Sequence, residues 1–202
     1  MNKGKTTGRR GRPRAFNLDE ALDKALLVFW QKGYEGASLD DLTRAMGINR
    51  PSLYAAFGNK ESLFRKALDR YERGPSSFAR EALKEPTARG VVELLLQEAI
   101  KMHTDPQTPP GCLMVQAALV SGEGADTIRQ ELNARRAADE LGLRRRLIRA
   151  KAEGDLPHNA NPADLARYVV TIMRGMAVQA ASGASRNELR RVAHMALRAW
   201  PE

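Results

Sequence analysis

The sequence predicts an all-α protein of about nine helices. Proline and glycine fall at the boundaries between segments, and no stretch sustains the two-residue alternation that is typical of a half-buried strand. Within the segments, apolar residues recur at three- and four-residue spacing, which places them on one face of a helix. The chain has 202 residues, 43% of them apolar, so it can bury a substantial core in one large or two small domains.

Four helices are expected in the first third of the chain, each opened by a residue whose side chain can cap the first turn. The expected N-caps are Asn17, Ser38, Asn49 and Asn59. The first three helices end at glycines, which adopt the conformations that follow a helix most readily. These glycines are Gly33, Gly47 and Gly58. Longer helices are expected over residues 88–103, 112–121, 125–153, 162–182 and 185–199, with prolines at two of the junctions between them.

The positive charge is concentrated at the N-terminus. Residues 1–14 carry six basic side chains and no acid, which is +6 of the formal net charge of +9. Residues 1–15 are rich in glycine and polar groups, so we expect a disordered basic arm. The stretch "RGRPR" resembles the core of an AT-hook, in which arginines such as Arg12 and Arg14 enter a narrow minor groove. The alternative is a tail that only improves solubility.

The stretch "LDDLTRAMGINRPSLYAAF" matches a helix-turn-helix motif. Gly47 provides the tight turn, and Ile48 is expected to pack back between the two helices. Pro51 is tolerated in the first turn, where the N–H groups have no helical partner, and it stiffens that end. Leu53 and Phe57 are four residues apart and face the core. The alternative interpretation is three small helices that pack a minor core without binding DNA.

The outer face of the same helix carries polar groups suited to a nucleic acid. Arg50, Ser52 and Tyr54 point away from the expected core, and a phenol on that face can donate a hydrogen bond to a phosphate oxygen. Lys60 follows in the first turn of the next helix, where the amide groups and the helix dipole already favour an anion. These positions predict a surface that contacts a DNA backbone and its base edges.

Residues 16–64 resemble the DNA-binding domain of tetracycline repressor-like (TetR family) transcriptional regulators. The resemblance rests on the order of four elements: "KGYEGAS", "LDDLTRAMGI", "RPSLYAAFG" and "NKESLF". It covers about a quarter of the chain, and the segment "PPGCLMVQAAL" resembles one subgroup of the family more weakly. The resemblance implies a three-helix DNA-binding domain over residues 16–64 and an effector-binding and dimerisation domain over residues 65–202.

The resemblance also implies roles for individual residues. Base edges would be read at the start of the recognition helix, and Arg50 suits bidentate contact with guanine. The implied DNA-contacting set is Arg12, Arg14, Ser38, Arg50, Pro51, Ser52, Tyr54 and Lys60. A repressor of this family binds a palindromic operator as a dimer, which places two recognition helices ~34 Å apart along the duplex.

The last two long helices build the dimer in this family, as a four-helix bundle. Here they carry apolar residues at helical spacing, although some of these positions would also suit an intrachain core. The expected interface residues are Leu165, Val169, Ile172, Met176, Leu189, Val192 and Met195.

The middle of the chain is expected to form a pocket for a small-molecule effector, because members of the family are generally one-component switches. An apolar lining rich in methionine suits an apolar or aromatic effector. The expected lining residues are Leu95, Ala99, Met102, His103, Cys112, Val115, Leu119, Met173 and Ala177. The same residues at helical spacing would also suit plain core packing.

The remaining observations favour a regulator over other classes. No catalytic or nucleotide-binding motif occurs, so we expect no enzyme and no cofactor. The three histidines and Cys112 lack zinc-type spacing, so no metal site is expected. A single cysteine and the lack of a signal sequence or membrane span suit the cytoplasm. Two alternatives stay open: an architectural DNA-binding protein, and a redox or electrophile sensor that acts through Cys112, whose place at a helix start can lower the thiol pKa.

Overall fold

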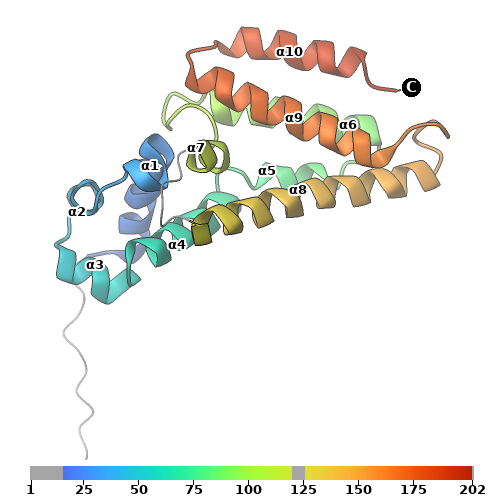
Figure 1. The fold of residues 1–202 in the computed structure, drawn as a ribbon. Helices are drawn as coiled ribbons and strands as arrows, with labels where there is room; N and C mark the ends of the chain where they lie inside the picture. The colour runs from blue at the N-terminus through green and yellow to red at the C-terminus, as the bar shows by residue number, and fades with distance from the viewer. Residues whose placement is uncertain (1–15, 120–125, 202) are drawn as a thin grey trace, which may run out of the picture.

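The computed structural model describes residues 16–119 and 126–201, which form ten α-helices and no strand (Figure 1). The prediction of an all-α fold is therefore confirmed. The helices are α1 (Leu18–Gly36), α2 (Leu39–Met46), α3 (Arg50–Phe57), α4 (Lys60–Arg73), α5 (Phe78–Ala82), α6 (Ala88–His103), α7 (Leu113–Leu119), α8 (Asp126–Ala152), α9 (Pro162–Ala181) and α10 (Arg186–Arg198). Nine of them lie in the nine expected segments. The tenth, α5, has five residues and no side-chain cap, so the sequence gives it no signal.

The side chain at each of the four expected N-caps accepts one or two of the free amide N–H groups of the first turn. Asn17 accepts from two backbone N–H groups of α1. Ser38 and Asp41 form a reciprocal capping box at α2, with bonds of 3.0 and 3.1 Å. Asn49 and Asn59 each accept a backbone N–H at 2.8 Å, at the starts of α3 and α4. Each such cap contributes about 1 kcal/mol, so the local sequence fixes where the N-terminal helices begin.

Two glycines shape the N-terminal helices. Gly33 has φ 70° and ψ 179°, so regular helix stops there, as expected, although one further turn carries α1 to Gly36. Gly47 is left-handed, with φ 68° and ψ 31°, and its N–H bonds back to α2. The N–H of Ile48 also bonds back, to the Thr43 carbonyl at 3.1 Å. Glycine adopts these conformations without strain, so the positions of the two glycines in the sequence predict where the helices break.

Helices α1 to α4 share their core with α7 and the start of α8. Phe29 meets Phe64 edge-on with ring centroids 4.9 Å apart, and Trp30 meets Tyr71 edge-on at 4.8 Å. All four rings are fully buried. Leu132 of α8 belongs to the same apolar cluster. The N-terminal helices are therefore packed directly against the rest of the protein, and α4 runs across the expected boundary at residues 64 and 65.

A second core joins α6, α8, α9 and α10. In Figure 1, α8 runs along one side of the molecule, beside α4 at its start and beneath α9 further on. Its Leu132 lies in the first core, whereas Leu143 and Leu147 lie in the second. The single helix α8 therefore contacts both parts of the fold. Across the described ranges, no helix has both the length and the apolar character that crossing a bilayer requires.

Candidate DNA-binding face and internal cavity

Helices α2 and α3, with the Gly47 turn between them, form the expected helix-turn-helix. Leu53 and Phe57 are buried, and Ile48 is partly buried against the same cluster, as the sequence predicted. Pro51 lies in the first turn of α3 and is exposed. The packing therefore leaves the opposite face of α3 open to solvent.

The residues predicted to read base edges lie at the N-terminus of α3. Arg50 is exposed, and its Nη2 lies 2.7 Å from Oδ1 of Asp40 on α2. The hydrogen bond to Asp40 and the charge of that carboxylate raise the pKa of Arg50. Ser52 is half-buried, and its backbone N–H donates to Asn49. The sequence did not indicate the contact between Arg50 and Asp40, which are ten residues apart.

The residues predicted to contact phosphates differ in their surroundings. Tyr54 is 48% exposed on the outer face of α3. Ser38 is exposed, but its hydroxyl donates to Asp41 Oδ2 at 2.7 Å. The Lys60 ammonium lies 4.6 Å from the ring centroid of Tyr34, and partial burial lowers its pKa. A cation–π contact of this kind holds the side chain in place, and it was not expected from the sequence. Arg12 and Arg14 lie outside the described residues.

Helix α4 is held by ion pairs on two sides. Arg70 makes two hydrogen bonds to the Asp23 carboxylate of α1, at 2.7 and 2.9 Å. On the other side, Arg65 of α4 bonds Glu131 of α8 at 2.6 Å. Arg135 of α8 reaches back to two carboxylates of α4 and also pairs with Glu131. These links connect α4 to α1 and to α8, beyond the packing of its apolar face.

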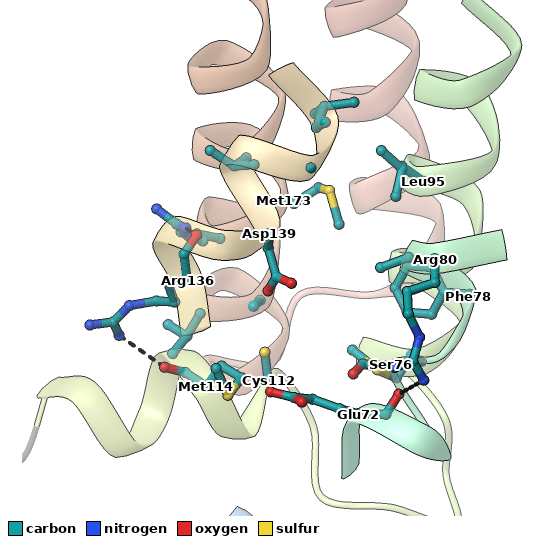
Figure 2. Close-up of a pocket in the computed structure, with 18 of the residues that line it drawn as sticks. Glu72, Ser76, Phe78, Arg80, Leu95, Cys112, Met114, Arg136, Asp139 and Met173 are labelled. Atoms are coloured by element: carbon teal, nitrogen blue, oxygen red, sulfur yellow. Dashed lines mark hydrogen bonds between the residues drawn. The ribbon is translucent and has the colours of Figure 1, made fainter. Parts of the chain in front are cut away.

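A cavity of about 320 Å³ lies between the C-terminal end of α4 and helices α5 to α9 (Figure 2). Most of its wall is apolar. Seven of the nine residues predicted to line a pocket are found there: Leu95, Met102, His103, Cys112, Val115, Met173 and Ala177. Ala99 is fully buried and is not among the residues that line the cavity. The side chain of Leu119 is outside the described part of the structure.

Polar groups that the sequence did not single out also line the cavity. Asp139 of α8 and Glu72 of α4 place carboxylates there, and Arg80 lies at the edge beside Glu72 (Figure 2). The loss of hydration against the cavity wall, together with the charge of Glu72, raises the pKa of Asp139 to about 6. Charged residues along α8 resemble a solvated helix face in the sequence, and only the fold reveals which of them faces inward.

Cys112 lies beside the phenol of Tyr71, whose hydroxyl donates to the thiol sulfur over 3.3 Å. Burial raises the pKa of Cys112, so the position at a helix start does not produce the lowered pKa considered for a sensor. His103 is buried, its Nδ1 lies 3.2 Å from the Gly111 carbonyl, and burial lowers its pKa. Within the described ranges, no group of three or more metal-binding side chains occurs.

The predicted interface residues of α9 and α10 fall into three groups. Val169, Met176 and Leu189 are buried in the protomer's own core, and their place in a dimer interface stays a prediction. The second group, Leu165 and Ile172, is partly buried against that core. The third group is exposed: Val192 at 40% and Met195 at 69%. Helical spacing alone does not separate the two sides of such helices.

Two protein-family models match the chain. The model described as "Bacterial regulatory proteins, tetR family" matches residues 21–67. The model described as "Tetracyclin repressor-like, C-terminal domain" matches residues 86–196. Together they cover the helix-turn-helix, the parts of the cavity wall from α6 to α9 and most of the two last helices, so the match extends well beyond the N-terminal motif.

Relatives and solved structures agree with these models. The HTH-type transcriptional repressor ComR of Escherichia coli K12 is 37% identical over 195 residues, which is 96% of this chain and 93% of ComR. The uncharacterised regulator YezE of Bacillus subtilis 168 is 31% identical over 79% of this chain and 83% of YezE. A cysteine mutant of the regulator CifR, complexed with 26-bp double-strand operator DNA, is 44% identical with a TM-score of 0.90, covering 94% of this chain and 100% of that one.

Proposed function

This chain belongs to the TetR family of transcriptional regulators, and from that membership we propose that it is a one-component repressor. Its dimer binds a palindromic operator, and a small-molecule effector changes the affinity. The observation that carries the proposal is the likeness, over nearly the whole chain, to CifR, whose structure holds operator DNA. Because the relatives are transcriptional regulators, no enzymatic activity is part of the proposal. A bacterial regulator of this kind acts on DNA in the cytoplasm.

The DNA-contacting face is proposed to be the outer side of α3 with its flanking helix ends. Arg50, Pro51 and Ser52 lie against base edges in the major groove, with Arg50 as the residue that reads guanine. The exposure of Arg50 supports this role. When its pair with Asp40 breaks, the Nη2 group also becomes available to DNA. Tyr54 donates to a phosphate, supported by its exposed hydroxyl-bearing ring. These contacts set position on the duplex as well as sequence preference.

The residues around this face complete the proposed contact with the backbone. Ser38 and Lys60 lie at the N-termini of α2 and α4, where the helix dipole and free amide groups attract a phosphate. Arg12 and Arg14 are proposed to follow the minor groove as part of an arm over residues 1–15. The DNA-binding domain then spans residues 16–64, and the effector-binding and dimerisation domain spans residues 65–202.

Helix α4 is the proposed link between the effector and the DNA-binding face. Its C-terminal end supplies Tyr71 and Glu72 to the cavity wall, and its N-terminal end follows α3 directly. Arg70 pairs with Asp23 of α1, and α3 directly precedes α4 in the chain. A tilt of α4 therefore moves the recognition helix α3 as well. An effector shifts the equilibrium only by its different affinity for the two tilts, commonly ~1–3 kcal/mol.

The dimer is proposed to form through the exposed sides of α9 and α10. Val192 and Met195 of α10 and Val178 of α9 are exposed apolar side chains. Gly175 of α9 has open space around its Cβ position, which permits close approach of another helix. An exposed apolar surface on two adjacent helices is typical of a helix-bundle interface.

Selection of bound sites from random duplex DNA tests the proposal, followed by two variants. Tyr54→Phe removes one phosphate hydrogen bond and should weaken binding to all duplexes alike, by about 3- to 10-fold. Arg50→Ala should weaken binding and also reduce the preference for one base pair of each half-site. An unchanged base preference in Arg50→Ala would show that another residue reads the operator.

The alternative of an architectural DNA-binding protein makes a different prediction for the same assay. Such a protein binds through its charge, so its affinity falls steeply with salt and differs little between sequences. The proposed repressor instead keeps a strong preference for its selected site at physiological salt. Measuring the affinity for selected and scrambled duplexes over a salt series therefore separates the two functions.

A further inference from the structure

The carboxylate of Asp139 stands out among the charged groups of the cavity. It projects from α8 into the open space between Met173 and Cys112 (Figure 2). Within the described ranges, no side chain or backbone group forms a hydrogen bond or an ion pair with it. A carboxylate that loses hydration without gaining a partner is destabilised, and its raised pKa reports that cost. The Asp139 carboxylate therefore has no direct partner among the described residues, although the charges of Arg174, Arg135 and Arg80 act on it from a distance.

The cations near Asp139 are engaged elsewhere. Arg135, one turn before it on α8, pairs with carboxylates of Glu72, Asp69 and Glu131. Arg80 donates to the backbone carbonyl of Glu72 at 2.9 Å. The Asp139 carboxylate points into the open space (Figure 2).

Two further arginines of the wall donate to backbone carbonyls. Arg136 donates to the Met114 carbonyl at 3.0 Å and points outward (Figure 2). Arg174 donates to the backbone carbonyl of Arg136 at 3.2 Å. Burial lowers the pKa of His103.

The opposite wall of the cavity is apolar. Leu95, Phe78 and Met173 face Asp139 across the open space in Figure 2. Leu143, one turn after Asp139 on α8, and Val170 of α9 add further apolar lining. A volume of about 320 Å³ accommodates a small molecule with an aromatic or alkyl body. The Asp139 carboxylate and the large apolar wall together suit an amphipathic ligand.

Building on the proposed function, we propose that the effector is an amphipathic amine, whose ammonium group pairs with Asp139 while its apolar body packs on Leu95, Phe78 and Met173. The ammonium also approaches Glu72, where it competes with Arg135. Weakening the pair between Glu72 and Arg135, which are 2.9 Å apart, loosens the connection between α4 and α8. Ligand binding is thereby coupled to the helix that carries the DNA-binding face.

Three probes with one apolar body test the proposal: 4-phenylbutylamine, 4-phenylbutanol and 4-phenylbutanoate. Their dissociation constants are measured by calorimetry on the full chain without DNA, at about pH 8, where Asp139 is ionised. The amine is expected to bind at least about tenfold more tightly than the alcohol, and the carboxylate more weakly than both. Asp139→Asn should remove the preference for the amine and leave the affinity for the alcohol near that of the wild type.

Glu140→Gln is the matched control, because Glu140 neighbours Asp139 but pairs with Arg167 and does not line the cavity. It should keep the amine preference. In the wild type, lowering the pH through about 6 protonates Asp139 and should reduce the preference without any substitution. The charged groups whose fields act on Asp139 are Glu72 on α4, Arg80 on α5, Arg135 on α8 and Arg174 on α9.

Equal binding of the three probes, no binding of any, preference for the carboxylate, or retained amine preference in Asp139→Asn would each overturn the proposal. These measurements contain no DNA, so their outcome does not depend on whether the protein binds an operator. Operator binding by the wild type is measured separately. If that binding is present and the amine preference is absent, only the ligand class is wrong.

Discussion

Nη2 of Arg50 lies 2.7 Å from Oδ1 of Asp40, so the first residue of the recognition helix is paired with the preceding helix. Both side chains are more than half exposed, which makes the pair weak and readily exchanged. A guanidinium held by one carboxylate oxygen keeps further donors free. The pair therefore orients Arg50 in the free protein, and the proposed contact of Arg50 with DNA has to compete with it.

Replacing Asp40 with asparagine is expected to strengthen DNA binding. The variant removes a negative charge from the DNA-facing side and releases Arg50, so affinity for all duplexes should rise by a few-fold at low salt and less at high salt. Fluorescence anisotropy with labelled duplexes measures this. Asp164→Asn removes the same charge from an exposed position on α9 and should have little effect. Weaker binding by Asp40→Asn would mean that the pair positions Arg50 productively.

Replacing Met195 with glutamate is expected to separate the dimer. Met195 is 69% exposed in the protomer, so the substitution costs little within one chain but buries a charge at the proposed interface. Sedimentation should show monomers at micromolar concentration, together with weaker operator binding. Leu27→Glu places the same charge at a 40% exposed position on α1 and should remain dimeric. A dimeric Met195→Glu variant would place the interface elsewhere.

Replacing Gly111 with alanine is expected to destabilise the protein. Gly111 has φ +87°, and a Cβ there would lie 2.8 Å from the Ala177 carbonyl oxygen. Gly154 has a similar φ of +81° with no atom within 4 Å, so Gly154→Ala carries the backbone strain alone, about 1–2 kcal/mol. Urea unfolding at one protein concentration should show a larger loss for Gly111→Ala, by at least about 1 kcal/mol. Equal losses would show that the loop moves aside freely.

The Cys112 thiol is expected to react slowly at neutral pH. Burial raises the pKa of Cys112. The thiolate fraction, and with it the alkylation rate, should therefore rise only at pH values above those at which an ordinary free thiol ionises. The Tyr71 hydroxyl lowers that pKa in part, so Tyr71→Phe should move the midpoint still higher. Iodoacetamide rates followed by mass spectrometry over pH measure both. A midpoint below that of glutathione would favour the sensor that acts through Cys112.

The sequence predicted the local features of the fold well, because they depend on near neighbours. Asn49 and Asn59 cap the helices that follow them, and Leu53 and Phe57 fill the core at four-residue spacing. Even the cavity wall was largely foreseen, since apolar residues such as Met173 can line either a core or a pocket.

Features that depend on the angle between helices were not foreseen. The contact of Arg50 with Asp40 needs the crossing of α2 and α3, and the inward direction of Asp139 needs the rotation of α8. Val169 and Met176 share their helix spacing with exposed neighbours, so periodicity could not tell a protomer core from an interface. Ala99 shows the same ambiguity on α6, where only one side of the apolar face borders the cavity.

The central claim, that a dimer reads an operator through α3, is tested most directly by the stoichiometry and affinity of binding to a duplex selected from random DNA. We expect two related half-sites with centres about one helical turn apart, ~34 Å, and an even number of protomers on each duplex. At about 0.15 M salt, affinity for the selected duplex should exceed that for a scrambled one by at least ~100-fold. Binding of single protomers, with equal affinity for both duplexes, would contradict the account.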